Sequence, residues 1–268
     1  VNYKKSLEIN PNYAEGHNNL GVAFYKLRKF NEAIDSYQRA IKIKPNFSKA
    51  HNNLGLAYKE LEKFTESINN YQKAIKINPK YAEAYNNLGV TFKQLGELNE
   101  SFNSYQKAIK INPKYAEAYN NLGNVYNSNQ KIDDAILNYK KAIKLNANFP
   151  EAYSNLGNLL KEIGEVEEAE KYENKLLSLR PNDIEYKINV ILSISPIVSS
   201  IEEINYCRNK YEKGLDLLKE YQYLSEKPGD TIKTSTFLLG YHAKDNLELM
   251  KNTSDISPIQ NMNSEDPL

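Results

Sequence analysis

The sequence predicts an all-α solenoid of repeated helix pairs, and two observations support this prediction. Proline recurs at an interval of 34 residues, at Pro11, Pro45, Pro79, Pro113 and Pro181. Between the prolines, apolar residues follow the i, i+3, i+4, i+7 spacing of one helical face. A fixed period of this length is typical of stacked supersecondary units, each of which buries its apolar surface against its neighbours.

Five full repeats align without gaps when the proline is placed at position 32 of each unit. They span residues 14–47, 48–81, 82–115, 116–149 and 150–183, and residues 1–13 form a partial repeat, its second helix only. The residue before a proline is pushed out of the α region, so we expect the second helix of each unit to end there. In the fourth repeat Ala147 replaces the proline, but Pro150 suits the first turn of the next helix.

Each repeat is expected to contain a first helix and a second helix that pack closely. The buried face of the first helix is illustrated by Tyr85, Leu88, Gly89 and Phe92. Glycine inside a helix costs about 1 kcal/mol relative to alanine, so its recurrence predicts close approach by the backbone of the second helix. The recurring glycines are Gly21, Gly55, Gly89, Gly123 and Gly157.

The residues at positions 4, 7, 8, 11, 20, 24, 27 and 32 of the repeats resemble the tetratricopeptide repeat pattern. The resemblance covers roughly two thirds of the chain. It implies a superhelical solenoid of about five and a half helix-turn-helix units whose concave face binds polypeptide. The fifth repeat departs from the pattern, because Glu173 stands where the earlier repeats have tyrosine.

The composition argues against nucleic-acid and membrane partners. The chain has 35 basic and 34 acidic residues, which gives no basic surface for nucleic acid or for an anionic membrane. The most apolar stretch, residues 190–201, is too short to span a bilayer. A single cysteine, Cys207, fits a reducing compartment, so we expect a cytoplasmic protein.

No catalytic site, cofactor site or metal site is expected. The sequence contains no glycine-rich phosphate loop, no paired metal-ligand spacing and no nucleophile-base constellation. His17 and His51 occupy the aromatic slot at position 4, where packing is the expected role, and the roles of His242 and Cys207 stay open.

Amide side chains are predicted to line the concave groove. Positions 2, 6, 9 and 13 of the first helix lie opposite its buried face. A side-chain amide has donors and an acceptor, so a regular series can bind the backbone of an extended peptide without reading its side chains. The expected groove residues are Asn19, Asn53, Asn87, Asn121 and Asn155 at position 6, Asn18, Asn52, Asn86 and Asn120 at position 5, and Asn124 and Asn158 at position 9.

Other interpretations of these asparagines stay open. Asparagine at position 6 is common in the family pattern, and the doubled Asn-Asn also fits a chain rich in Asn, Lys, Ile and Tyr. A clamp for a terminal carboxylate, known in tetratricopeptide co-chaperones, is not expected, because only Lys49 matches its basic positions.

Beyond the repeats we expect a helical connector at residues 184–250 and a disordered tail at 251–268. Residues 195–218 and 236–250 resemble the connector that precedes the transferase domain of bacterial SPINDLY-like, O-GlcNAc-transferase-like proteins. The resemblance implies a substrate-recognition arm truncated before its glycosyltransferase domain, and no transferase activity for this chain itself. The alternatives are a stand-alone scaffold for protein assembly and a fusion to an unrelated enzyme.

The first residues of the chain suggest self-association. The partial repeat exposes Tyr3, Leu7 and Ile9, which a preceding helix would cover. We therefore expect the open ends of the array to mediate contacts between copies.

Overall fold

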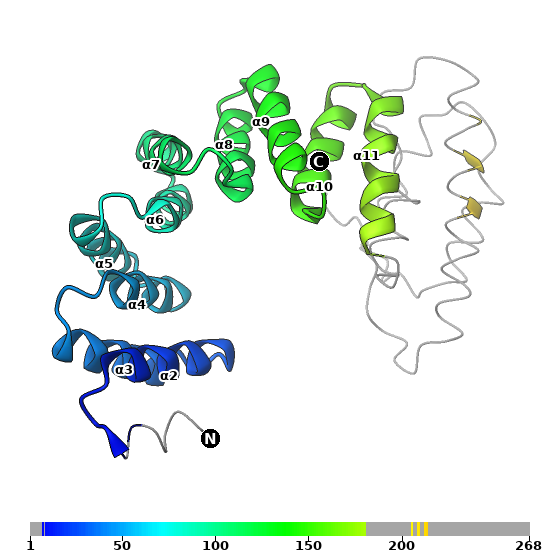
Figure 1. Cartoon of the computed structure of the whole chain (residues 1–268). Helices are drawn as coiled ribbons and strands as arrows, with labels where there is room; N and C mark the ends of the chain where they lie inside the picture. Colours follow the sequence, from blue (N-terminus) through cyan, green and yellow to red (C-terminus); the bar gives the residue numbers. More distant parts are fainter. Residues whose placement is uncertain (1–6, 8, 181–204, 206–207, 210–211, 214–268) are drawn as a thin grey trace, which may run out of the picture. The chain divides into compact units, whose positions relative to one another are not determined.

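The computed structural model describes residues 7, 9–180, 205, 208, 209, 212 and 213. Within this part the chain forms five consecutive helix pairs and no strand (Figure 1), which confirms the all-α repeat fold. The first helices of the pairs are α2 (Ala14–Lys26), α4 (Ser48–Glu60), α6 (Ala82–Gln94), α8 (Ala116–Ser128) and α10 (Pro150–Glu162). The second helices are α3 (Phe30–Ile43), α5 (Phe64–Ile77), α7 (Leu98–Ile111), α9 (Ile132–Leu145) and α11 (Val166–Leu179).

Several expectations fall on residues that the structure does not describe. The connector at 184–250, apart from five residues, and the tail at 251–268 lie outside the described residues. So do Cys207, His242 and most of the partial repeat at 1–13. None of the described helices is long and apolar enough to cross a bilayer.

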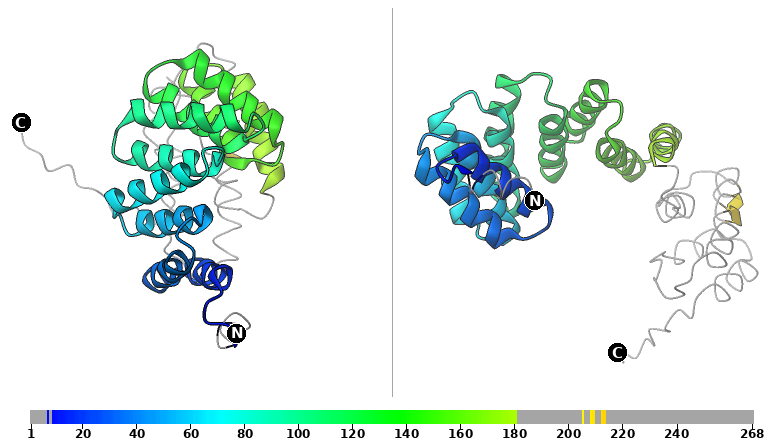
Figure 2. Two further views of the ribbon diagram at one scale, coloured as in Figure 1. Left: turned by 60° about the vertical axis from the view of Figure 1, so that its left-hand side comes forward. Right: turned by 60° about the horizontal axis from the view of Figure 1, so that its bottom comes forward.

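The chain divides into two units between Ala152 and Tyr153. In the first unit consecutive helices from α2 to α9 pack on one another, and the helix pairs stack one after another (Figures 1 and 2). The first helices also contact each other in order, α2 with α4, α4 with α6 and α6 with α8. Figure 1 shows α4 and α6 inside the curve of this stack and α5 and α7 outside it. We call the surface carried by α2, α4, α6 and α8 the inner face.

A tyrosine ring packs on a glycine in each of the first four helix pairs. Tyr105 on α7 is only 1% exposed, and a Cβ atom added to Gly89 on α6 would lie 2.7 Å from its ring. The equivalent pairs are Gly21 with Tyr37, Gly55 with Tyr71, and Gly123 with Tyr139. The sequence predicted close approach by the backbone of the second helix. The structure shows that the nearest neighbour is instead a tyrosine ring.

The fifth pair, which lies almost wholly in the second unit, replaces this contact with an ion pair. Glu173 on α11 occupies the tyrosine position, is 4% exposed and pairs with Lys161 on α10. A Cβ atom on Gly157 would meet Glu173 Cγ at 3.4 Å, an ordinary van der Waals distance. Packing therefore does not require glycine at this position.

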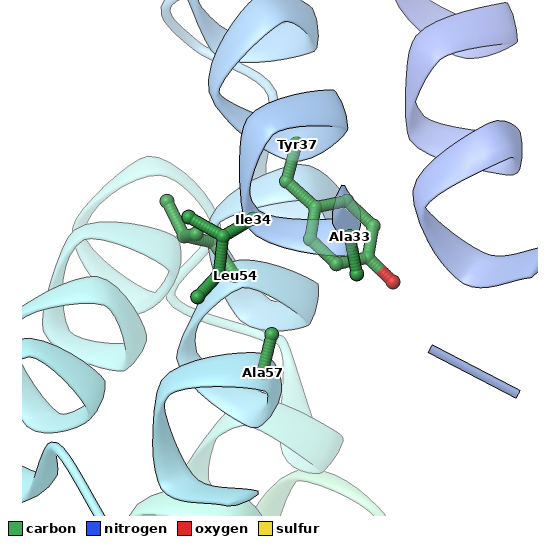
Figure 3. Close-up of a cluster of buried hydrophobic side chains, with 5 residues drawn as sticks. All are labelled: Ala33, Ile34, Tyr37, Leu54 and Ala57. Atoms are coloured by element: carbon green, nitrogen blue, oxygen red, sulfur yellow. The ribbon is translucent and has the colours of Figure 1, made fainter. Parts of the chain in front are cut away.

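Apolar side chains also fill the space between successive pairs. Ala33, Ile34 and Tyr37 of α3 pack with Leu54 and Ala57 of α4 in one buried cluster (Figure 3). Because the cluster joins one repeat to the next, the core continues along the stack.

Replacing Gly89 by alanine is expected to destabilise the protein. The added methyl group would overlap the buried Tyr105 ring, and such overpacking costs about 1–3 kcal/mol, more than the gain in helix propensity of about 1 kcal/mol. Gly157→Ala is the matched control and should be neutral or stabilising by up to about 1 kcal/mol. Urea unfolding followed by circular dichroism measures both effects, and equal responses of the two variants would contradict the ring-on-glycine packing.

The buried tyrosines predict a loss of stability at alkaline pH. Burial raises the pKa of Tyr105 from its usual value of 10.0 to about 12, and it also raises the pKa of Tyr71. Because the folded state holds the proton more tightly than the unfolded chain, this contribution is complete below pH 10 and is lost as the pH rises through about 12.

The measurement is tyrosinate absorbance during a pH titration of the folded protein. Exposed tyrosines should ionise first, and the buried ones only together with unfolding. A single ionisation step near pH 10 with the fold intact would contradict the expected burial.

Candidate functional site

The asparagines predicted to line a groove lie on the first helices, but their exposure differs between the two positions. At position 6, Asn19 is exposed, Asn87 and Asn121 are half-buried, and Asn53 is 8% exposed. The position-5 residues are all buried: Asn18, Asn52, Asn86 and Asn120. Of positions 5 and 6, only position 6 therefore offers amides that a partner can reach.

Neighbouring first helices are joined by hydrogen bonds between these two positions. Asn53 Nδ2 donates to Asn18 Oδ1 at 2.9 Å, from position 6 of the second repeat to position 5 of the first. The same bond recurs from Asn87 Nδ2 to Asn52 Oδ1 at 3.0 Å and from Asn121 Nδ2 to Asn86 Oδ1 at 3.1 Å. We call this recurring bond the amide clasp.

The clasp gives the doubled Asn-Asn motif a structural role. In α4, Asn53 donates to the preceding repeat, while Asn52 accepts from the following one. Asn52 Nδ2 also lies 3.3 Å from Glu83 Oε1 and donates to it. The position-5 amides were predicted to face the groove, and their burial instead assigns them to the contact between repeats.

The clasp uses only part of each position-6 amide. An asparagine side chain offers two N–H donors and an acceptor oxygen. Among the described residues, the side chains of Asn87 and Asn121 each make the clasp bond and no other hydrogen bond. One N–H and the Oδ1 atom of each are thus available at the inner face, in an orientation that the clasp restrains.

The remaining predicted residues differ in their surroundings. Asn124 Oδ1, at position 9, accepts a hydrogen bond of 2.8 Å from the Tyr139 hydroxyl. Asn155 and Asn158 lie on α10 in the second unit, where Asn155 is half-buried and Asn158 is exposed. The earlier position-9 residues are half-buried and apolar: Val22, Leu56 and Val90.

A group of charged and aromatic residues, which the sequence interpretation did not single out, lies where α6 and α8 begin. The Tyr115 hydroxyl donates to Glu117 Oε2 at 3.4 Å. Burial raises the pKa of Tyr115, and the nearby charges of Glu117 and Glu83 raise it further. Tyr81 comes directly before α6, and burial and the nearby charge of Glu83 raise its pKa. We call Tyr81, Glu83, Tyr115 and Glu117 the tyrosine-glutamate cluster. The signal in the sequence is the recurring Tyr-Ala-Glu at residues 81–83 and 115–117.

The two histidines of the repeats are buried, and each contacts the turn that precedes its helix. His17 Nε2 lies 2.9 Å from the carbonyl oxygen of Pro11, and His51 Nε2 lies 3.1 Å from that of Pro45. Each ring nitrogen therefore lies within hydrogen-bond distance of the backbone carbonyl of the proline near the end of the preceding repeat. In the part of the chain that is described, no cluster of His, Cys, Asp or Glu side chains could hold a metal ion.

Comparison with known families identifies the repeats. Tetratricopeptide repeat models match residues 14–47, 36–69 and 150–183, and a TPR repeat model matches 57–96, 91–130 and 123–164. Together these matches cover residues 14–183 without a gap. No curated protein matches the chain.

Solved structures show the same fold. MamA is 30% identical, with a TM-score of 0.53 over 62% of this chain and 98% of that chain. PilF of Pseudomonas aeruginosa is 19% identical, with a TM-score of 0.65 over 79% of this chain and 93% of that one. YrrB, described as a TPR protein with an unusual peptide-binding site, is 18% identical, with a TM-score of 0.50 over 68% and 94%. None of these matches supports the resemblance of residues 195–218 and 236–250 to a transferase connector.

Removing one partner of the amide clasp should destabilise the stack. Asn52→Ala leaves the Asn87 amide without its acceptor and removes a buried hydrogen bond, so unfolding should become easier by about 1–2 kcal/mol. Asn103→Ala, on the exposed face of α7, is the control and should change stability by less than about 0.5 kcal/mol.

A double-mutant cycle with Asn52→Ala and Asn87→Ala isolates the bond itself. We expect a coupling energy of about 0.5–1.5 kcal/mol from urea unfolding. Strictly additive effects of the two substitutions would contradict the clasp.

Proposed function

The chain belongs to the tetratricopeptide repeat family, and we propose that its inner face binds an extended polypeptide through the position-6 amides. The observation that carries this proposal is the amide clasp. It leaves one donor and one acceptor of Asn87 and of Asn121 available at equivalent places on successive repeats. Such a series suits the N–H and C=O groups of a peptide backbone.

Restraint by the clasp favours binding. A free asparagine side chain would lose rotamer freedom when it binds a peptide, and this loss weakens association by about 0.5–1.5 kcal/mol for each side chain ordered. Asn87 and Asn121 are already held by Asn52 and Asn86. Most of their rotamer freedom is therefore lost when the protein folds and not when a peptide binds. Asn53, which is almost fully buried, is expected to contribute less.

The similarity to YrrB is consistent with this proposal at the level of fold. The peptide-binding site in its description belongs to YrrB, and at 18% identity the similarity transfers the architecture alone. The assignment for this chain therefore rests on its own asparagines.

A narrower proposal is that the array is the substrate-recognition arm of an O-GlcNAc-transferase-like protein. It rests on the resemblance of residues 195–218 and 236–250, whereas the stand-alone scaffold needs no further domain. The coding sequence after Leu268 distinguishes them: an open frame into a nucleotide-sugar-binding domain supports the arm, and a stop codon supports the scaffold.

Self-association through the surface around Ile9 is a separate proposal. Ile9 is 87% exposed, which fits an apolar surface that another copy could cover. Light scattering at increasing protein concentration tests it, and a strictly monomeric species would contradict it.

The test of peptide binding compares two double variants. An array of short, unstructured peptides of varied sequence is probed with the full chain. Asn87→Ala with Asn121→Ala removes the accessible amides, so the affinity for the peptides bound should fall by about tenfold, because each lost hydrogen bond contributes about 0.5–1.5 kcal/mol.

The control, Asn52→Ala with Asn86→Ala, breaks the same two clasps from the buried side and keeps the accessible amides. It should weaken binding less than the first double variant. Unchanged affinity of the Asn87/Asn121 variant, or no binding to any peptide, would contradict the proposed function.

A further inference from the structure

The first repeat contains a cation held by its own chain. Lys44 Nζ pairs with Glu15 Oε1 at 2.8 Å and lies 4.9 Å from the centroid of the Phe47 ring. These three residues occupy positions 31, 2 and 34 of the repeat. The repeat geometry thus brings a carboxylate at the start of the first helix and an aromatic ring at the end of the unit to the same ammonium group.

The third repeat keeps the carboxylate and the ring but lacks the cation. Its residues at positions 2, 31 and 34 are Glu83, Asn112 and Tyr115. Asn112 is too short to replace a lysine, and its Oδ1 accepts the backbone N–H of Lys114 at 3.1 Å. In the third repeat, position 31 therefore supplies no cationic side chain between Glu83 and Tyr115, where the first repeat has Lys44.

A second carboxylate, that of Glu117, is hydrogen-bonded to the tyrosine of this repeat. Glu117, at the start of α8, accepts a hydrogen bond from the Tyr115 hydroxyl, and Tyr81 comes directly before α6. Glu83 and Glu117 are both exposed. In the part of the chain that is described, neither carboxylate forms an ion pair with lysine or arginine, although Lys114 lies next to Tyr115 in the sequence.

The tyrosine-glutamate cluster adjoins the asparagines of the inner face. Asn52 donates one N–H to Glu83 and accepts the clasp bond from Asn87. A peptide backbone bound at Asn87 and Asn121 would therefore carry its side chains past Glu83. Position 2 is Lys49 in the second repeat and glutamate in the other four, and the Glu15 carboxylate of the first repeat is paired with Lys44.

We propose that the tyrosine-glutamate cluster binds a lysine or arginine side chain of the polypeptide that occupies the inner face. This inference rests on the proposed function and adds a preference for basic sequence to it. Two carboxylates supply charge-assisted hydrogen bonds, and the tyrosine rings supply cation-π attraction. Lys44 in the first repeat shows the same chemistry within one chain.

The test uses matched peptides that differ in one lysine, free or acetylated, taken from sequences that the chain binds. The full chain should bind the free lysine about five- to tenfold more tightly, and the preference should weaken at high salt. Glu83→Gln with Glu117→Gln should abolish the preference and leave the affinity for the acetylated peptide unchanged. Glu66→Gln with Glu100→Gln removes the same charge from α5 and α7 and should keep the preference.

A third variant reproduces the first repeat. Asn112→Lys should place the chain's own ammonium group against Glu83 and Tyr115, and binding of the lysine peptide should fall to that of the acetylated one. Equal affinities of the two peptides for the unsubstituted chain, or a preference that persists in the Glu83/Glu117 variant, would overturn this inference while peptide binding stands. No peptide binding at all would overturn the proposed function and this inference together.

Discussion

The packing of a tyrosine ring on a glycine within each of the first four helix pairs is the constraint on which the rest of the structure depends. In the third repeat the buried Tyr105 ring occupies the place where a side chain on Gly89 would lie. This contact fixes which face of the first helix packs on the second helix of the same pair. The opposite face can then contact the neighbouring repeats. The amide clasp then forms on that face, from Asn87 to Asn52. The position of the accessible amides thus depends on the tyrosine-glycine packing within a pair and on the amide clasp between pairs.

The period of 34 residues was sufficient to predict the helix pairs, because proline and glycine have local backbone effects that show in the sequence. It was not sufficient to predict what each glycine contacts. Close approach was expected at Gly89, but whether backbone or the Tyr105 ring fills that space depends on the tertiary arrangement. Glu173 was recognised as a departure, whereas its half-buried partner Lys161 lies on the other helix of the pair and carries no sequence signal.

The assignment of the asparagines to a groove stays a prediction, but the structure separates the two positions. Positions 5 and 6 were both assigned to the groove, and the structure buries position 5. The reason is that the clasp joins residues 35 apart, such as Asn86 and Asn121, one more than the period. Periodicity shows which residues are equivalent, but it does not show how far one repeat is offset against the next. Asn52 also donates to Glu83, which is 31 residues further along the chain, and this bond links the amides to an acidic surface.

The central claim is that a polypeptide contacts the position-6 amides of the inner face. The most direct measurement is nuclear magnetic resonance of the side-chain amide groups while a lysine-containing peptide is added. We expect the resonances of Asn87 and Asn121 to shift with a common saturation curve, and that of the exposed Asn103 on α7 to stay unchanged. Binding that shifts resonances of the second helices and leaves Asn87 and Asn121 unaffected would contradict the account.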